Sequence, residues 1–149
     1  MTAVVKTRVV ASPSERVWDV LAAFERIAEW APEVDHSSLL TEHGSGVGAV
    51  RRVQLGRMVL TETVRTWQAG SGLSYTIAGL PPVVRSVVNT WQLEPASDGT
   101  LVVLTTEIDA GPRPPQLLIA RAVGRRLGAA GDSMLAGLAA HLERQERPT

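Results

Sequence analysis

The side chains in this sequence with the means for acid–base chemistry lie on segments that alternate like β-strands. Glu62 shares one face of the segment 58–64 with Met58, Leu60 and Val64. If that face is buried, apolar surroundings favour the protonated carboxyl group, and Glu62 could act as a general acid or base. The simpler alternative, which we favour, is a carboxylate that pairs with a cross-strand arginine or faces water.

Tyr75 is the best single candidate for a polar group in an otherwise apolar pocket. It shares a strand face with Leu73 and Ile77, and its phenol can donate or accept a hydrogen bond. The structural alternative, again favoured, is a core tyrosine whose hydroxyl group binds the backbone. Glu62 and Tyr75 are therefore the two candidates for a catalytic role.

Arg85, Asn89 and Trp91 share one face of the predicted strand Val84–Glu94. Arginine and asparagine could orient a carbonyl or carboxylate group of a ligand, and Trp91 could form a wall or serve as a core anchor. The opposite face begins with Val84, Ser86 and Val88 and is nearly as apolar. The sequence therefore leaves open which face of this strand points inward.

Arg51 lies on the same strand face as Ala49, Val53 and Leu55. It is a buried partner of Glu62, a residue at the mouth of a cavity, or a solvated side chain beyond the core. An unpaired buried arginine is very costly, so an inward Arg51 predicts a carboxylate nearby.

Several kinds of site are not predicted. The chain has no cysteine, and its three histidines, at positions 36, 43 and 141, lack metal-ligand spacing, so we expect no metal and no cofactor. No G-x-S-x-G segment is present. The glycine-rich segment 44–48 precedes a strand instead of a helix, which argues against a phosphate loop.

Length and charge favour one cytoplasmic domain over residues 1–149. With 15 basic and 15 acidic residues, the formal net charge is zero, so we expect no nucleic-acid partner. No signal peptide or long apolar run is apparent, so stable membrane insertion is not expected. A homodimer is not predicted. A cluster of four arginines at positions 113, 121, 125 and 126 suggests a solvated face more than a membrane-docking surface.

The elements that position these residues are seven strands and two helical segments. Ser12-Pro13-Ser14-Glu15 predicts a capped helix that places Phe24 and Ile27 on one apolar face and stops near Trp30. Short turns between the strands imply antiparallel neighbours. The predicted strands are Ala3–Val10, Val34–Thr41, Val47–Leu55, Met58–Trp67, Leu73–Ala78, Val84–Glu94 and Leu101–Asp109.

The final helix, predicted over Pro114–Gln145, carries an apolar stripe that includes Val123 and Leu127. It also carries four glycines, at positions 124, 128, 131 and 137. Each glycine costs about 1 kcal/mol relative to alanine in a helix interior. Close packing, a bend near Gly128 or Gly131, or cavity space could offset that cost, and a single helix behind a wide sheet suggests a hollow.

The segments Ala11–Leu21 and Trp30–Val34, with Trp91–Pro95 and the following Gly99-Thr100, resemble the START-like superfamily, which includes Bet v 1-like proteins and polyketide cyclases. The resemblance covers nearly the whole chain. It implies an α+β helix-grip fold: a seven-stranded curved antiparallel sheet wrapped on the long C-terminal helix, with short helices after the first strand. It also implies an apolar cavity between sheet and helix. We expect that cavity to be lined by Trp30, Tyr75, Arg85, Asn89, Trp91, Val123 and Leu127.

Three functions remain open. The first is binding of a small, mainly hydrophobic molecule, lipid- or polyketide-like, between the sheet and the final helix. The second is a polyketide cyclase or dehydratase in which Glu62, Tyr75, Arg85 and Asn89 transfer protons and polarise a carbonyl group. The third is a protein–protein regulatory module, which predicts an exposed apolar patch instead of a deep pocket.

Overall fold

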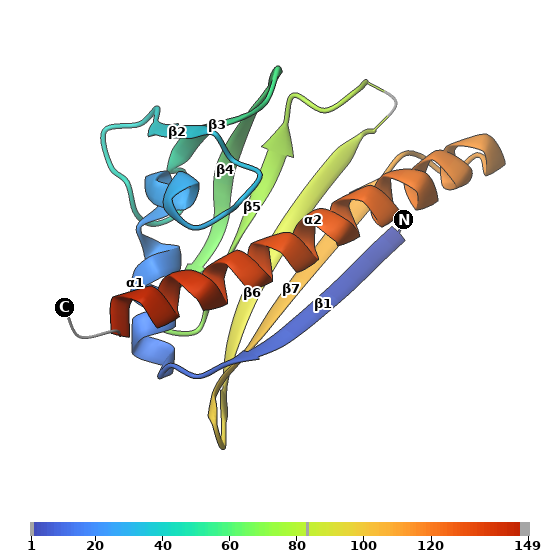
Figure 1. Cartoon of the computed structure of the whole chain (residues 1–149). Helices are drawn as coiled ribbons and strands as arrows, with labels where there is room; N and C mark the ends of the chain where they lie inside the picture. Colours follow the sequence, from blue (N-terminus) through green and yellow to red (C-terminus); the bar gives the residue numbers. More distant parts are fainter. Residues whose placement is uncertain (1, 83, 147–149) are drawn as a thin grey trace.

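The computed structural model describes residues 2–82 and 84–146, and within them a curved antiparallel sheet packs against one long helix (Figure 1). The strand order is β1-β7-β6-β5-β4-β3-β2. The predicted α+β helix-grip fold is confirmed. The elements are β1 (Thr2–Val10), α1 (Ser14–Ala22), the 3-10 helix η1 (Phe24–Glu29), β2 (His36–Leu39), β3 (Val50–Leu55), β4 (Met58–Gln68), β5 (Gly72–Ala78), β6 (Ser86–Ala96), β7 (Gly99–Asp109) and α2 (Pro114–Glu146).

The strands lie where the alternation predicts them, except that β2 and β3 are shorter than expected. The chain between them turns at Gly46 and Gly48, whose φ angles of 86° and 91° fall in the left-handed region. Pairing resumes at Val50, whose carbonyl oxygen accepts a hydrogen bond from the Leu40 amide. A loop therefore replaces the predicted ends of both strands.

The predicted cap of the first helix is wrong in detail. Pro13 occupies the N-cap position, and its carbonyl oxygen accepts hydrogen bonds from the amides of Arg16 and Val17. The Ser12 hydroxyl group instead donates to Glu146 Oε1 over 2.8 Å, and Arg16 forms an ion pair with the same oxygen. A long-range contact with the end of α2 thus takes the side chain that the local sequence assigns to a cap.

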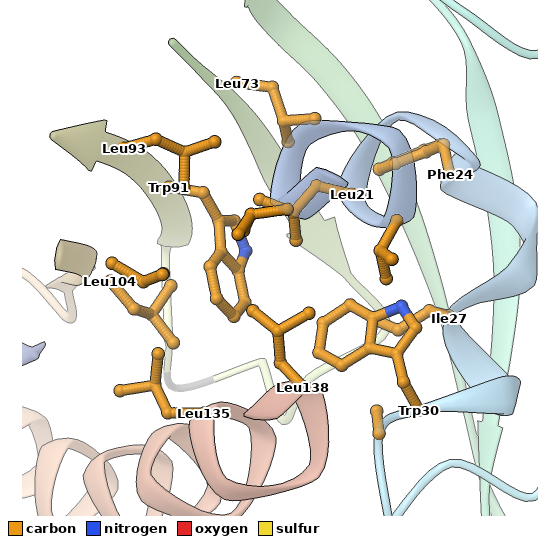
Figure 2. Packing of buried hydrophobic residues seen from close by; sticks show 14 of the residues in the cluster. Leu21, Phe24, Ile27, Trp30, Leu73, Trp91, Leu93, Leu104, Leu135 and Leu138 are labelled. Atoms are coloured by element: carbon orange, nitrogen blue, oxygen red, sulfur yellow. The ribbon is translucent and has the colours of Figure 1, made fainter. Parts of the chain in front are cut away.

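The main core fills the space between α1, η1, the sheet and the C-terminal half of α2. Trp30 and Trp91 meet edge to face, with ring centroids 5.7 Å apart. Figure 2 shows Leu138 of α2 beside both rings, and Leu21 of α1 on the sheet side of the cluster. All four side chains are buried. The hollow that the sequence suggests here is therefore occupied by side chains.

The helix glycines mediate close packing and do not create cavity space. A Cβ atom at Gly124 would lie 3.4 Å from side-chain atoms of Ile108, Thr2 and Val4. At Gly137 it would overlap the carbonyl oxygen of Trp30. The suggestion that these glycines mark a hollow is therefore wrong. Helix α2 runs unbroken from Pro114 to Glu146, with no interruption at Gly128 or Gly131.

Replacing Gly137 by alanine should destabilise the fold, although alanine is the better helix former. The new methyl group would overlap the Trp30 carbonyl oxygen and lie 2.7 Å from Pro32 Cδ, and such overpacking costs about 1–3 kcal/mol. Gly131→Ala is the matched control. Its Cβ atom meets Leu104 Cδ2 at an ordinary 3.4 Å, so it should raise stability by up to about 1 kcal/mol. Urea unfolding of both variants measures the difference, and equal stabilisation would refute the packing role of Gly137.

Candidate functional site

A row of five polar side chains crosses the inner face of the sheet, one from each strand from β3 to β7. Arg51 faces Glu62 in the strand register, Tyr75 faces Asn89, and Asn89 faces Thr106. None of the five is more than 5% exposed. We call them the polar row. Its geometry answers the question that the sequence left open, because Asn89 and its neighbours at alternate positions along β6 point inward.

Arg51 and Glu62 form a buried ion pair at one end of the row. Nε and Nη2 of Arg51 both lie 2.7 Å from Glu62 Oε1, and Nη1 donates to the Phe24 carbonyl oxygen over 2.7 Å. The guanidinium carbon lies 3.8 Å from the centre of the Phe24 ring and 4.7 Å from that of the Tyr75 ring. The expectation that an inward Arg51 requires a nearby carboxylate is confirmed.

The two carboxylate oxygens of Glu62 differ in their contacts. Both contacts with Arg51 use Oε1, and within residues 2–82 and 84–146 no hydrogen bond reaches Oε2. Arg51 therefore fixes only one of the two carboxylate oxygens.

Tyr75 carries the central hydroxyl group of the row. Its oxygen accepts hydrogen bonds from Trp91 Nε1 over 3.2 Å and from Asn89 Nδ2 over 3.3 Å. Asn89 is oriented in turn, because its Oδ1 accepts a 2.7 Å hydrogen bond from Thr106. No described residue accepts the Tyr75 proton, so that proton remains available to a ligand oxygen. The expected backbone partner is replaced by side chains.

The pKa of Tyr75 is raised, chiefly because burial disfavours the phenolate and also because the Glu62 carboxylate is close. The Arg51 charge and the hydrogen bonds from Trp91 and Asn89 oppose this shift only in part. Tyr75 is therefore a neutral hydrogen-bond donor at physiological pH.

The other predicted lining residues divide into two groups. Asn89, Trp91 and Trp30 are buried at the inner face or in the core, whereas Arg85 precedes β6 and is exposed, so the structure does not bring it into the polar row. Val123 and Leu127 are half-buried and pack with Ile77 against a second, smaller apolar cluster. That cluster consists of Val87, Ile108, Ala110 and Ala120.

Sequence reasoning missed two members of the site. Thr106 could have been found, because it lies on the same face of its strand as Leu104 and Ile108. The Phe24 carbonyl group could not, because a backbone group carries no side-chain signal. The Phe24 carbonyl oxygen can accept a hydrogen bond from Arg51 because it lies where the chain passes from α1 into η1.

The surface of the described residues includes three solvent-open hollows. One of about 250 Å³ lies between α1, η1 and the end of α2, next to His141, whose pKa is lowered by burial and by the Arg144 charge. Two of about 310 Å³ lie at the β5–β6 edge and between η1 and α2. None is lined by a member of the polar row. The expected ligand cavity between sheet and helix is thus not among these three.

The family described as polyketide cyclase/dehydrase and lipid transport matches residues 1–143 of the chain. The chain belongs to this family. The START-like, Bet v 1-like resemblance of the sequence is thereby confirmed. No curated protein matches the sequence.

Solved structures agree on the fold. The aromatase/cyclase Zhui from Streptomyces sp. R1128 is 22% identical, with 98% of this chain and 96% of that chain covered and a TM-score of 0.77. Ara h 8.0201 is 13% identical, with coverages of 93% and 98% and a TM-score of 0.68. A Mesorhizobium loti protein, MLL2253, is 23% identical, with coverages of 98% and 100% and a TM-score of 0.76.

Family and fold together support a role in binding a hydrophobic ligand or in cyclase-type chemistry. Among the described residues, no helix has the length and apolar character needed to cross a bilayer. At these sequence identities, the structural likeness establishes the fold alone. The part that this chain's own residues could play in binding or catalysis therefore has to be judged from the geometry of the polar row.

Removing one partner of the buried ion pair should destabilise the fold much more than removing both. Arg51→Met leaves the Glu62 carboxylate buried without its partner and should cost about 3–5 kcal/mol. The double variant Arg51→Met/Glu62→Leu removes both charges and should recover most of that loss. A double-mutant cycle from urea unfolding measures the coupling, and additive losses would contradict it.

Tyr75 is the only tyrosine of the chain, so ultraviolet absorbance reports its ionisation directly. Because its folded-state pKa lies above that of the unfolded chain, the folded state holds the proton more tightly. The resulting stabilisation is fully present below pH 10 and is lost as the pH rises through the folded-state pKa. Half-ionisation should therefore occur above pH 10 in native protein and near pH 10 in urea. Coincident titrations would contradict the burial of this hydroxyl group.

Proposed function

We propose that this protein binds a small, mainly apolar molecule with an oxygen-bearing end, between the sheet and the N-terminal half of α2. One observation carries the proposal. Next to Arg51, the Tyr75 hydroxyl group has a proton that no described residue accepts, and Glu62 has an oxygen that no described residue binds. A hydrogen-bond donor and an acceptor thus lie on the same inner face of the sheet, among apolar side chains, and a few polar groups in apolar surroundings are the usual composition of a small-molecule site.

The apolar part of the ligand would lie along the half-buried flank of α2. The helix packs against β1 and β7, toward one side of the sheet (Figure 1). Val123 and Leu127 on its other flank are only half-buried, as are Ile77 and Leu80 beside them. These side chains offer apolar surface that the fold itself does not fully cover.

Access would come from the N-terminal end of α2, because Trp30, Trp91 and Leu138 fill the opposite end. Binding would require Val123 and Leu127 to move away from the cluster of Val87, Ile108, Ala110 and Ala120. The ligand would replace the contacts that these side chains make with that cluster, so apolar area would remain buried in both states.

An enzymatic version of the same site is supported by the convergence of Glu62 and Tyr75. A neutral Tyr75 could polarise a carbonyl group, and Glu62 Oε2 could accept a proton from a neighbouring carbon. Of the four residues assigned to such chemistry from the sequence, Glu62, Tyr75 and Asn89 belong to the polar row, and the exposed Arg85 does not.

Native mass spectrometry of gently purified protein should show a bound small molecule that denaturation releases. Tyr75→Phe should weaken binding of that compound about 5- to 10-fold, because one hydrogen bond contributes about 1–1.5 kcal/mol. Leu127→Gln, on the apolar flank, should also weaken binding. Thr105→Val, on the outer face of β7, should not.

Thermal unfolding of each variant shows whether a variant that fails to bind is still folded. The proposal is refuted if no bound mass appears and if lipids and aromatic polyketides leave the tryptophan fluorescence unchanged. It is also refuted if Tyr75→Phe and Leu127→Gln bind as the wild type does.

A further inference from the structure

Charge is divided between the two ends of α2, although the net charge of the chain is zero. Residues 110–131 contain four arginines and no acidic residue, whereas residues 14–42 contain seven acidic residues and two arginines. The acidic segment includes α1 and η1, which lie by the C-terminal end of α2, and the N-terminal end of α2 projects away from them (Figure 1). The helix dipole adds positive potential at that projecting end.

The arginines of the projecting end are free of partners. We define the basic pole as Arg85, Arg113, Arg121, Arg125 and Arg126. All five are exposed, and no side chain among them forms an ion pair or hydrogen bond with any residue in 2–82 or 84–146. Arg85 belongs here because its amide binds the carbonyl oxygen of Asp109, just ahead of α2. Within the described part of the chain, their charges are therefore not neutralised by an ion pair.

Apolar side chains protrude among these charges. Leu118 is 66% exposed and Leu117 is 37% exposed, both in the first turns of α2. Leu118 precedes Arg121 by three residues and Arg125 by seven, so the three side chains share one face of the helix. An exposed leucine beside arginines can enter the headgroup region while the arginines stay at the anionic surface.

We propose that the basic pole docks on the anionic surface of a lipid bilayer, with Leu118 inserted among the headgroups. Arg121, Arg125 and Arg126 are all exposed on a helix end that projects from the rest of the molecule. Charges spread over such a projecting end suit a planar charged surface better than the shaped surface of an acidic protein. The acidic end would be repelled, which orients the molecule.

This docking goes beyond the proposed ligand site and does not depend on it. Vesicle binding can be measured with or without a ligand, so failure of one proposal leaves the other standing.

Flotation with lipid vesicles tests the proposal. The protein should float with phosphatidylcholine vesicles that contain about 30% phosphatidylserine and not with phosphatidylcholine alone. Binding should disappear in about 0.5 M salt. Each arginine at an anionic surface is worth roughly fivefold in partitioning. Arg121→Glu/Arg125→Glu should therefore lower binding by at least about 25-fold, and Leu118→Ser should lower it several-fold.

The matched control is Arg8→Glu/Arg65→Glu, which changes the net charge equally at exposed positions away from α2's N-terminal end. It should retain most of the binding, and circular dichroism should show that all variants are folded. The proposal is overturned if the wild type does not float, or if the two double variants lose binding equally. It is also overturned if the wild type binds soluble polyglutamate but not vesicles, because that result would assign the basic pole to an acidic protein.

Discussion

A buried positive charge constrains the centre of this structure. Arginine cannot shed its proton in a protein, so Arg51 has to be matched wherever it is buried. Glu62 on the next strand supplies the opposite charge, and the Phe24 carbonyl group supplies a further acceptor. The Phe24 and Tyr75 rings lie against the guanidinium group. Three strands and the start of η1 are thereby positioned around one side chain, and the orientation of Tyr75 follows from that arrangement.

The polar row separates two apolar regions that differ in how well they are covered. On the side of α1 and η1, two tryptophans and the C-terminal half of α2 close the core. On the other side, a cluster of four buried residues lies beneath side chains that are themselves half-buried, among them Val123 and Leu127 of α2. Exposed apolar area is most often tolerated where something else covers it. The ligand site that we propose lies on this second side, beside the polar row.

Local patterns in the sequence predicted the fold well and the site only in part. Alternation placed the strands, and the cost of burying Arg51 correctly predicted its carboxylate partner. The inward face of β6 could not be assigned, because Val84 and Val88 make the outer face nearly as apolar as the inner one. The role of the α2 glycines depends on which segment each of them touches. The Ser12 hydroxyl group binds Glu146, 134 residues away, instead of capping the first helix. Such long-range contacts leave no local signal.

The pairing of β1 with β7 has a consequence for how the chain folds. Thr2 lies opposite Ile108 and Val10 opposite Thr100, so the first strand has no sheet partner until the seventh has been made. Contacts of such sequence separation carry a large loop-closure cost and are associated with slow folding. The valine-rich strand β1 therefore stays without a sheet partner until β7 has been synthesised.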